Sequence, residues 1–203
     1  MKFIAANPGQ IALLAGQQLY LALVAVLIAC LIGIPLGILA RRFRPIELPT
    51  MLVAGLLYLI PSLVLFAFLI PFFGLGRTPA IIALVLYSLL VIVRNTVAGL
   101  RAVPAAIEEA ARGIGMSALQ RLWLVELPIA LPVILGGVRI ATVMNIGVAS
   151  IAAYIGAGGL GTLIFRGIAT VDSDTVLAGA IPIAILALAA DAVLKRAEAW
   201  TRP

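Results

Sequence analysis

Apolar residues form long runs along this chain, and short polar segments separate the runs. Because about 20 apolar residues carry a helix across a bilayer, each run predicts a membrane-spanning helix. The run from Leu127 is too long for one span, so we expect its helix to begin near Pro132; the third run stops at Arg94, although "NTVAGL" could extend it. The five predicted spans are Leu19–Ala40, Leu48–Phe73, Pro79–Val93, Pro132–Ile155 and Thr175–Leu194.

Proline and glycine recur inside the predicted spans. The first span carries Gly33, Pro35 and Gly37 near its end, which predicts a kink there. Such residues are tolerated in a membrane where neighbouring helices satisfy the freed carbonyl groups. We therefore expect a packed bundle of bent helices. The second span is the richest in proline, with Pro49, Pro61 and Pro71.

The composition places the chain in the membrane class. Of its 203 residues, 64% are hydrophobic and 11% are charged, whereas an ordinary soluble domain is about half apolar and about a quarter charged. The length predicts one domain, residues 1–203, with no room for a separate nucleotide-binding module. The start, "MKFIAANPGQ", lacks a long apolar segment followed by a small-residue cleavage site, so we do not expect a cleaved signal peptide.

The positive charges indicate an orientation in the membrane. The formal net charge is +6, but Lys and Arg are scattered in short segments without interleaved aromatic residues, which argues against binding to nucleic acid. Short cytoplasmic loops are enriched in Lys and Arg. With five spans and the N-terminus outside, the outer segments hold Lys2, Arg77 and Arg166. The cytoplasmic segments then hold nine basic residues, which predicts an N-out, C-in orientation: Arg41, Arg42, Arg44, Arg101, Arg112, Arg121, Lys195, Arg196 and Arg202.

Residues that could carry catalysis or bind a metal are scarce. There is no His and one Cys, Cys30, which we expect to act as a small hydrophobe. No phosphate-binding loop, catalytic triad or acidic metal site is present in the sequence, so we predict no enzyme activity, no metal and no cofactor on this chain. An aromatic cage could bind a quaternary ammonium ion, but the tyrosines are dispersed and predict no cage: Tyr20, Tyr58, Tyr87 and Tyr154.

Three ionisable residues lie within or beside the predicted spans. Arg94, Arg139 and Asp191 all fall near predicted cytoplasmic helix ends. In one interpretation the two arginines extend their charges to the membrane interface. In the other, Asp191 pairs with one of them and locks helices around an inner gate, since ionisable groups inside membranes are costly and tend to be functional.

The segment "EEAARGIGMSALQRLWLVELP", residues 108–128, is an amphipathic island between apolar runs. Pro104 can begin a helix, Gly113 and Gly115 can end it, and Ser117 can cap a second helix. Both a connector lying on the membrane surface and a docking element fit this pattern. The first helix would carry an apolar stripe with small residues at its centre: Ile107, Ala110, Ala111 and Ile114.

The island resembles the EAA motif of the membrane subunits of ATP-binding-cassette (ABC) importers. Glu109, Ala110 and Ala111 are followed, after three intervening residues, by Gly115. After nine more residues comes "VELP", in which Val125 replaces the usual Ile. The chain from about Gln17 to Leu194 is similar to the branch of these permeases that handles glycine betaine, choline and carnitine. Five further stretches carry this likeness: "GIPLGILARR", "YLIPSLVLFAFLIPFFGLGRTPAII", "VRNTVAGLRAVP", "LPVILGGVRIAT" and "IGAGGLGTLIFRGI".

The resemblance implies an all-α polytopic fold, the type I ABC importer transmembrane domain, in a bacterial or archaeal cytoplasmic membrane. It implies a coupling loop at about residues 101–126 that docks on a separate ATPase subunit, where ATP and magnesium bind. Further expected partners are a second ATPase subunit, a second permease subunit and an external substrate-binding protein; the chain shows no internal repeat that would supply the second half of a pathway. The docking residues implied are Glu109, Ala110, Ala111 and Gly115, flanked by Glu108 and Arg112.

The glycine-rich stretch "GAGGLG" matches the spacing of a dinucleotide-binding loop by chance. A predicted span precedes it in place of a strand, and Asp172, Asp174 and Asp191 stand at the wrong spacing for the ribose contact. A flexible outer turn and, by the resemblance, a tight outer hairpin with a short re-entrant stretch are the remaining interpretations. Its glycines are Gly156, Gly158, Gly159 and Gly161.

Other functions stay open at this point. The same machinery could import an amino acid such as methionine. A channel or secondary transporter would need no ATPase, but no acidic relay for protons or ions lies within the predicted spans. A structural membrane subunit is the fourth hypothesis.

Overall fold

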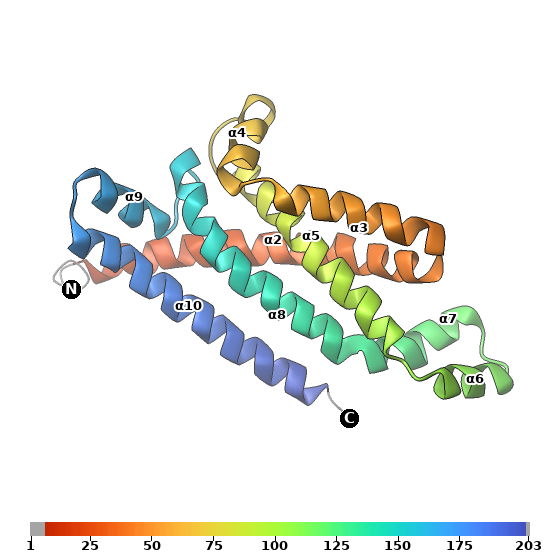
Figure 1. Ribbon diagram of the computed structural model, residues 1–203. Helices are drawn as coiled ribbons and strands as arrows, with labels where there is room; N and C mark the ends of the chain where they lie inside the picture. Colours follow the sequence, from red (N-terminus) through yellow and green to blue (C-terminus); the bar gives the residue numbers. More distant parts are fainter. Residues whose placement is uncertain (1–6, 202–203) are drawn as a thin grey trace.

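Four long helices run side by side along most of the molecule (Figure 1). The structure is a computed structural model that describes residues 7–201, and within this range it contains helices and no strands. Lys2, Arg202 and most of the initial segment in which we expected no signal cleavage lie outside that range. The long helices are α2 (Pro8–Arg42), α5 (Arg77–Arg101), α8 (Leu127–Ala152) and α10 (Ser173–Trp200). The shorter ones are α3 (Arg44–Leu59), α4 (Ser62–Phe73), α6 (Ala105–Gly113), α7 (Ala118–Arg121) and α9 (Gly161–Ala169).

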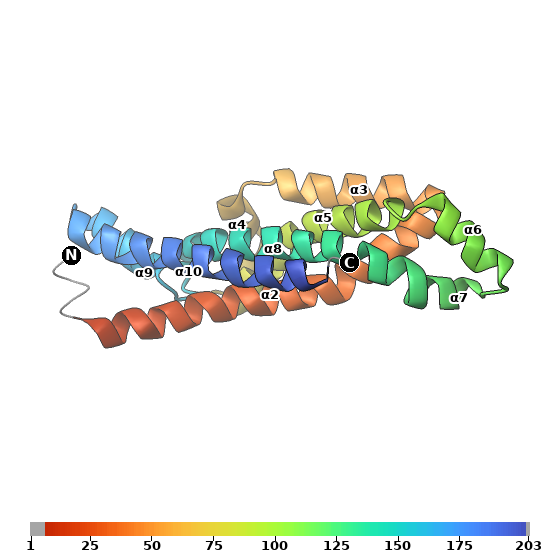
Figure 2. The ribbon, with the colours of Figure 1, turned by 90° about the horizontal axis from the view of Figure 1, so that it is seen from below.

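Helix α5 lies at the centre of the bundle, between α2 and α8. Figure 2 shows α2 and α3 on opposite sides, with α5 and α8 between them. Glycines permit close approach of the backbones: a Cβ on Gly37 of α2 would lie 2.6 Å from the Cβ of Thr96. On the other side of α5, a Cβ on Gly137 of α8 would lie 2.5 Å from the Cβ of Asn95. Small residues at such contacts are how helices pack tightly in a membrane.

The outside of the bundle is apolar. In the most hydrophobic window of α5, 56% of the residues are buried, whereas in that of α10 only 11% are buried. Both windows are strongly hydrophobic, so the difference comes from position and not from composition. Leucines such as Leu31 and Leu188 are exposed on this surface. A surface of this kind suits lipid or another membrane subunit.

The second predicted span, Leu48–Phe73, is not one continuous helix. The chain breaks at Ile60 and Pro61, and α3 and α4 meet at a bend of 98°. Pro61 has no N–H and disfavours the helical conformation of the residue before it, so Ile60 adopts ψ 126°. Within residues 7–201, four helices are thus long and apolar enough to cross a membrane, and the number of spans is five if the bent pair counts as one.

The fourth predicted span begins earlier than we expected. Residues Ala118–Ile155 form one helical rod of 38 residues, and neither Pro128 nor Pro132 ends it. A π-helical turn, Leu122–Glu126, precedes Pro128, and the N–H of Leu127 bonds the carbonyl of Leu122 five residues back. This wider turn makes room for the ring of Pro128, which in a regular α-helix would collide with the backbone carbonyl four residues earlier.

The other spans agree with the prediction in place but are longer. Helix α2 begins at Pro8 and continues through Pro35. Helix α5 includes "NTVAGL", as the sequence allowed, and ends at Arg101. Helix α10 runs on to Trp200.

We predict that Gly137→Ala destabilises the bundle, since its new methyl group would overlap Asn95; overpacking of this kind costs about 1–3 kcal/mol. Gly147 of the same helix is the matched control, because a Cβ there meets nothing within 4 Å. Gly147→Ala should leave stability unchanged or raise it slightly, as Ala is the better helix former. Thermal unfolding of the purified chain in detergent measures both, and equal midpoints for the two variants would contradict the packing described.

Candidate functional site

Helices α6 and α7 form a hairpin that projects from one end of the bundle (Figure 1). Gly115 makes the turn between them, with φ of +81°, a conformation that glycine adopts without strain. The N–H of Met116 bonds the carbonyl of Ala111, and the N–H of Gly115 bonds that of Arg112. These two bonds are the Schellman arrangement that closes a helix C-terminus. Helix α6 therefore ends at Gly113, and Gly115 is the residue that turns the chain into the second arm.

Ser117 starts the second arm of the hairpin, as the sequence predicted. Its hydroxyl accepts a hydrogen bond from the N–H of Gln120 at 3.3 Å, and the Gln120 side chain accepts one from the N–H of Ser117 at 2.8 Å. This reciprocal capping box fixes the start of α7. The arm is not a separate short helix, however, because it continues through the π-turn into α8.

The apolar stripe of α6 is mostly uncovered. Ala111 is buried against the chain itself, whereas Ile107, Ala110 and Ile114 are exposed, Ile114 to 75%. Leu119 and Trp123 of the second arm are exposed as well. Within the described residues, then, Ala110 and its neighbours present an apolar surface that no other segment covers. Exposed apolar patches of this kind mark interaction sites.

The charged residues of α6 divide between two directions. Glu108 turns toward the bundle, where its carboxylate lies 3.6 Å from the Arg112 guanidinium and 3.9 Å from that of Arg41. Glu109 points away and is exposed. Glu108 thus braces the hairpin against the end of α2. A hollow of about 280 Å³ lies between them, and four arginines, two glutamates and three apolar residues line it; Arg41, Arg112 and Arg121 are among the arginines.

A second ion pair ties the base of the hairpin to α3. The Arg101 guanidinium donates a hydrogen bond to the carboxylate of Glu47. Arg94, about two turns earlier on α5, is exposed beside the same pair, in a hollow of about 630 Å³. It lies on the α3 side of the bundle, away from Asp191.

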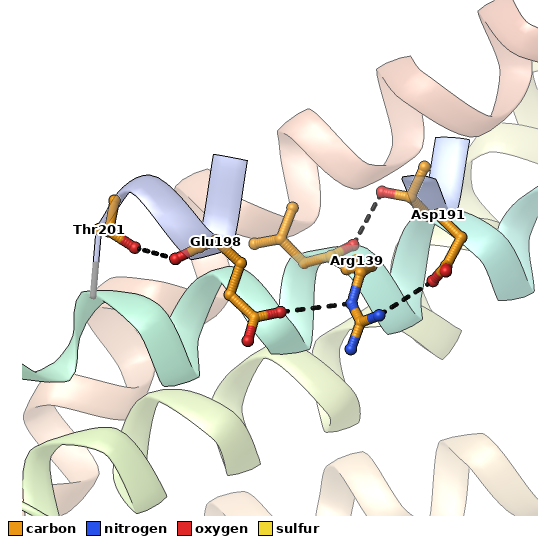
Figure 3. A network of polar contacts seen from close by, with 6 residues as sticks. Arg139, Asp191, Glu198 and Thr201 are labelled. Atoms are coloured by element: carbon orange, nitrogen blue, oxygen red, sulfur yellow. Dashed lines mark hydrogen bonds and ion pairs between the residues drawn. The ribbon is translucent and has the colours of Figure 1, made fainter. Parts of the chain in front are cut away.

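Arg139 and Asp191 are brought together across α8 and α10. The Arg139 guanidinium lies 3.2 Å from Asp191 and 3.4 Å from Glu198, so that it sits between two carboxylates (Figure 3). Sequence reasoning missed Glu198, which follows the predicted end of the last span. A separation of seven residues places Asp191 and Glu198 on one face of a helix, and this spacing is the signal that could have found it.

The glycine loop lies at the opposite end of the bundle, beside α9 (Figure 1). Gly156, Gly158 and Gly159 have positive φ. Two adjacent side chains of α2 hold the loop: Gln17 accepts from the N–H of Gly159 at 2.9 Å, and Gln18 from that of Leu160 at 3.1 Å. Gln18 also donates to the carbonyl of Ile146 at 2.7 Å. The loop is therefore a fixed hairpin and not a loose turn.

Side chains are excluded from this loop by close contacts. A Cβ on Gly158 or Gly159 would collide with the amide oxygens of Gln17 and Gln18, and one on Gly161 would enter the backbone of Ser150. A 3₁₀ turn, Ala153–Ile155, precedes the loop where a nucleotide-binding fold would have a strand. The dinucleotide interpretation therefore has no structural support, and no pattern in the sequence indicated the role of the two glutamines.

Asp172 caps α10 at the same end. Hydrogen bonds from the Thr175 hydroxyl, and further from the backbone of Thr175 and Asp174, hold the pKa of Asp172 below its usual value; partial desolvation opposes them and the charge of Arg166 assists them. The carboxylate is thus the stable form at the start of this helix, where the helix dipole also favours negative charge.

Two tyrosines that we predicted to be dispersed lie together at the bend between α3 and α4. The ring centroids of Tyr58 and Tyr87 are 6.1 Å apart, with an angle of 83° between the planes. The Tyr87 hydroxyl donates a hydrogen bond of 2.5 Å to the carbonyl of Ile60. The prediction that the tyrosines are all dispersed was wrong for this pair, because α3 packs against α5 and brings Tyr58 beside Tyr87.

The fold and the projecting hairpin define a class of protein, the membrane subunits of importers that work with a binding protein. Residues 33–203 match the family described as binding-protein-dependent transport system inner membrane component. The chain belongs to this family, and it is a membrane-embedded permease subunit of an ABC importer.

Two curated relatives match over nearly their whole length. The osmoprotectant import permease protein OsmW of Salmonella typhimurium is 48% identical, over 97% of this chain and 94% of its own. The glycine betaine/carnitine/choline transport system permease protein OpuCB of Bacillus subtilis is 37% identical, over 100% of this chain and 94% of its own.

Solved structures share the fold. A structure of the MetNI methionine ABC transporter in an inward-facing conformation matches with a TM-score of 0.86 and 21% identity, over 98% of this chain and 99% of that one. At this identity the likeness shows the fold alone, and it agrees with the expected type I importer architecture.

We predict that Asp191→Asn lowers the transport rate several-fold while leaving membrane insertion intact, because it removes one of the two carboxylates that hold α10 against Arg139. The loss of folding stability should be small, about 1 kcal/mol or less, since the pair is partly exposed. Asp191→Glu, which keeps the charge, is the control and should retain most of the activity. Uptake in proteoliposomes at matched protein density measures the effect; equal rates for the Asp191→Asn variant and the wild-type chain would show that the ion pair has no part in transport.

Proposed function

We propose that this permease subunit imports compact quaternary ammonium osmoprotectants such as glycine betaine, choline and carnitine. The observation that carries the proposal is the uncovered apolar face around Ala110 on a helix with EAA spacing, in a chain whose near full-length relatives are named for osmoprotectant transport. ATP hydrolysis belongs, in this proposal, to a separate ATPase subunit that binds ATP and magnesium.

The hairpin within residues 101–126 is the proposed docking site of the ATPase. An exposed apolar stripe with a small residue at its centre suits close approach by the wall of a groove, and Glu109, Arg112 and Gly115 border the stripe. Ala111 and Glu108, which the EAA resemblance also implicates, support the hairpin from within: Ala111 packs against the chain and Glu108 pairs with Arg41. Each of two permease chains would engage one ATPase subunit.

A second permease chain, identical or paralogous, would complete the pathway. The chain acts as one domain, residues 1–203, and half of a symmetric pair. The largely unburied apolar surface of helices such as α10 is in keeping with a neighbour in the membrane. The partner's contribution is expected from symmetry, since most membrane pathways of this kind lie between repeated units.

The orientation that we propose is N-out and C-in, in a bacterial or archaeal cytoplasmic membrane. The hairpin end of the bundle carries Arg41, Arg101 and Arg121, and the excess of positive charge at that end supports a cytoplasmic position. At the other end, the fixed glycine loop and α9 would face the external binding protein. Arg77, near that end, stacks over the Tyr20 ring at 5.7 Å.

Transport would follow from differential binding at the two ends. Closure of the ATPase pair on ATP would move the two hairpins together and shift the bundle between its inward- and outward-facing states. The loaded binding protein must prefer one of these states, because a ligand with equal affinity for both shifts nothing. The Arg139 network would then stabilise one arrangement of α8 and α10.

A related candidate is import of methionine by the same machinery. The MetNI likeness carries little weight for it, since at 21% identity it concerns the fold. A channel or secondary transporter that needs no ATPase, and a purely structural membrane subunit, leave the exposed EAA stripe without a purpose.

We predict that Ala110→Trp abolishes most ATPase binding, with at least a tenfold loss in co-purification, because the bulky ring would hold the two surfaces apart. Ala105→Trp is the matched control: it is exposed on the same helix, about 140° away around the axis at 3.6 residues per turn. Only the Ala110 variant should lose binding-protein-stimulated ATP hydrolysis in nanodiscs. Unchanged co-purification for Ala110→Trp would exclude this face as the docking site.

We predict that the assembled transporter takes up glycine betaine or choline in an ATP-dependent, saturable manner and does not take up methionine. Calorimetry of the partner binding protein against glycine betaine, choline, carnitine and methionine gives the preference independently. Faster uptake of methionine than of glycine betaine or choline would show that the proposed substrate is wrong. Uptake by this chain alone, driven by an ion gradient, would show that the proposed ATP-driven mechanism is wrong.

A further inference from the structure

Beside the bend between α3 and α4 lies an open cavity that the proposed function does not yet use. Its volume is about 290 Å³, close to the lower end of the roughly 300–1,000 Å³ typical of small-molecule sites. Tyr58 and Tyr87 line it together with Met144, Ser62 and the backbone at Ile60 and Pro61.

The cavity lies along the length of the bundle and not at its ends, and it opens to the surface of the chain, where Tyr58 is exposed. Tyr87 stands near the middle of the 25-residue α5, so its hydroxyl is not part of an aromatic belt at the membrane surface. The next residue, Ser88, accepts a hydrogen bond of 2.9 Å from Asn145, and both are fully buried. The Asn145 side-chain oxygen has no hydrogen-bond partner. Polar groups at this depth are costly, and they tend to mark transport pathways.

The walls of the cavity favour positive charge. The faces of aromatic rings are electron-rich, and rings set nearly at right angles present two such faces to one ligand. The last turn of α3 ends here, and carbonyl groups at a helix C-terminus carry partial negative charge. Discontinuous helices in transporters use such unwound carbonyls to bind cations near the membrane midplane. No acidic or basic side chain is among the residues that line this cavity.

These features select the type of cation. A compact ion, such as an ammonium with N–H donors, would lose strong hydration and find few acceptors in an apolar cavity. A quaternary ammonium has no N–H to satisfy and spreads its charge over methyl groups, so that ring faces can replace its weak hydration. The Ile60 carbonyl is already engaged by the Tyr87 hydroxyl, which orients that ring and positions the end of α3.

We propose that this cavity is a transit site for the quaternary ammonium group of the transported substrate, with Tyr58 as the ring that contacts it and Tyr87 as the second wall. The proposal rests on the proposed function for its substrate, but it assigns to this chain a selectivity that would otherwise belong to the binding protein alone. A shallow site of two rings, without a carboxylate, binds weakly enough for the substrate to leave, as conduction requires.

Uptake by the complete transporter in proteoliposomes gives the first test. Tyr58→Leu, which removes the ring from a partly exposed position, should lower kcat/KM for choline by about five- to tenfold, and Tyr58→Phe should stay within about twofold because it keeps the ring. Phe68→Leu removes an exposed ring of α4 that does not line the cavity, and it should have no effect. Equal loss in the Tyr58→Leu and Phe68→Leu variants would overturn the proposal.

Direct occupancy gives the second test, independent of transport. Cys30 is the only cysteine, so Ser62→Cys in a Cys30→Ser background places a single thiol in the cavity wall. Choline should slow its reaction with a maleimide, and 3,3-dimethyl-1-butanol, the uncharged isostere of choline, should not. Tyr58→Leu should remove the protection. Equal protection by both compounds would show that the cavity binds apolar groups without regard to charge. No protection by choline would show that the cavity is not a binding site.

The two proposals fail in different ways. If the wild-type transporter takes up no quaternary ammonium compound, the proposed function is wrong. If it does so and the Tyr58 variants and thiol protection show no effect, the proposed function stands and only the transit site is wrong.

Discussion

Within a membrane, every backbone N–H and C=O group must find its partner inside the protein, and this constraint determines most of what the structure contains. Continuous helices satisfy it along α2, α5, α8 and α10. At two of the places where the described chain departs from helical geometry, neighbouring side chains supply the missing bonds. The Tyr87 hydroxyl serves the carbonyl exposed at the Pro61 break, and Gln17 and Gln18 accept from the N–H groups of the glycine loop. The irregular backbone is tolerated at these two places because polar side chains of neighbouring helices form hydrogen bonds with it.

The two ends of the bundle differ in how they are built. At one end, hydrogen bonds from two glutamines hold the glycine loop, and its glycines leave no space for side chains. The other end is braced by ion pairs of Arg41 and Arg101 and yet leaves apolar side chains uncovered. Such a surface is available to a partner, and the ATPase subunit is the partner that we propose for it. A fixed glycine loop at one end and an uncovered hairpin at the other fit a subunit in which the hairpin takes up the movement of a partner.

Local features could be predicted from the sequence, and contacts between distant residues could not. The places of the four long apolar helices, the Gly115 turn and the Ser117 cap depend on neighbouring residues, and the structure agrees with them; the fifth predicted span is one span only if the bent pair α3 and α4 is counted together. The break at Ile60 was within reach, because Pro61 stood in a span, but its sharpness depends on where α5 lies. The Gln18 bond to Ile146 joins residues 128 positions apart, and no periodicity could reveal it. The meeting of Tyr58 with Tyr87 was missed for the same reason, whereas Glu198, the second carboxylate on Arg139, was within reach because it follows Asp191 by seven residues on one helix face.

The π-turn between α7 and α8 gives the hairpin two unlike attachments. Toward α8 it is one rod with no joint, Ala118–Ile155, about 57 Å long at 1.5 Å per residue and thus longer than the hydrocarbon core. Toward α5 it is connected through Pro104, and Gly115 separates its two arms. We therefore expect that a displacement of α6 would bend the chain at its connection to α5, and that α8 would rotate or tilt as a whole together with Arg139 and Met144. The π-turn that accommodates Pro128 thus also makes α8 part of the longest continuous helical segment in the described chain, Ala118–Ile155.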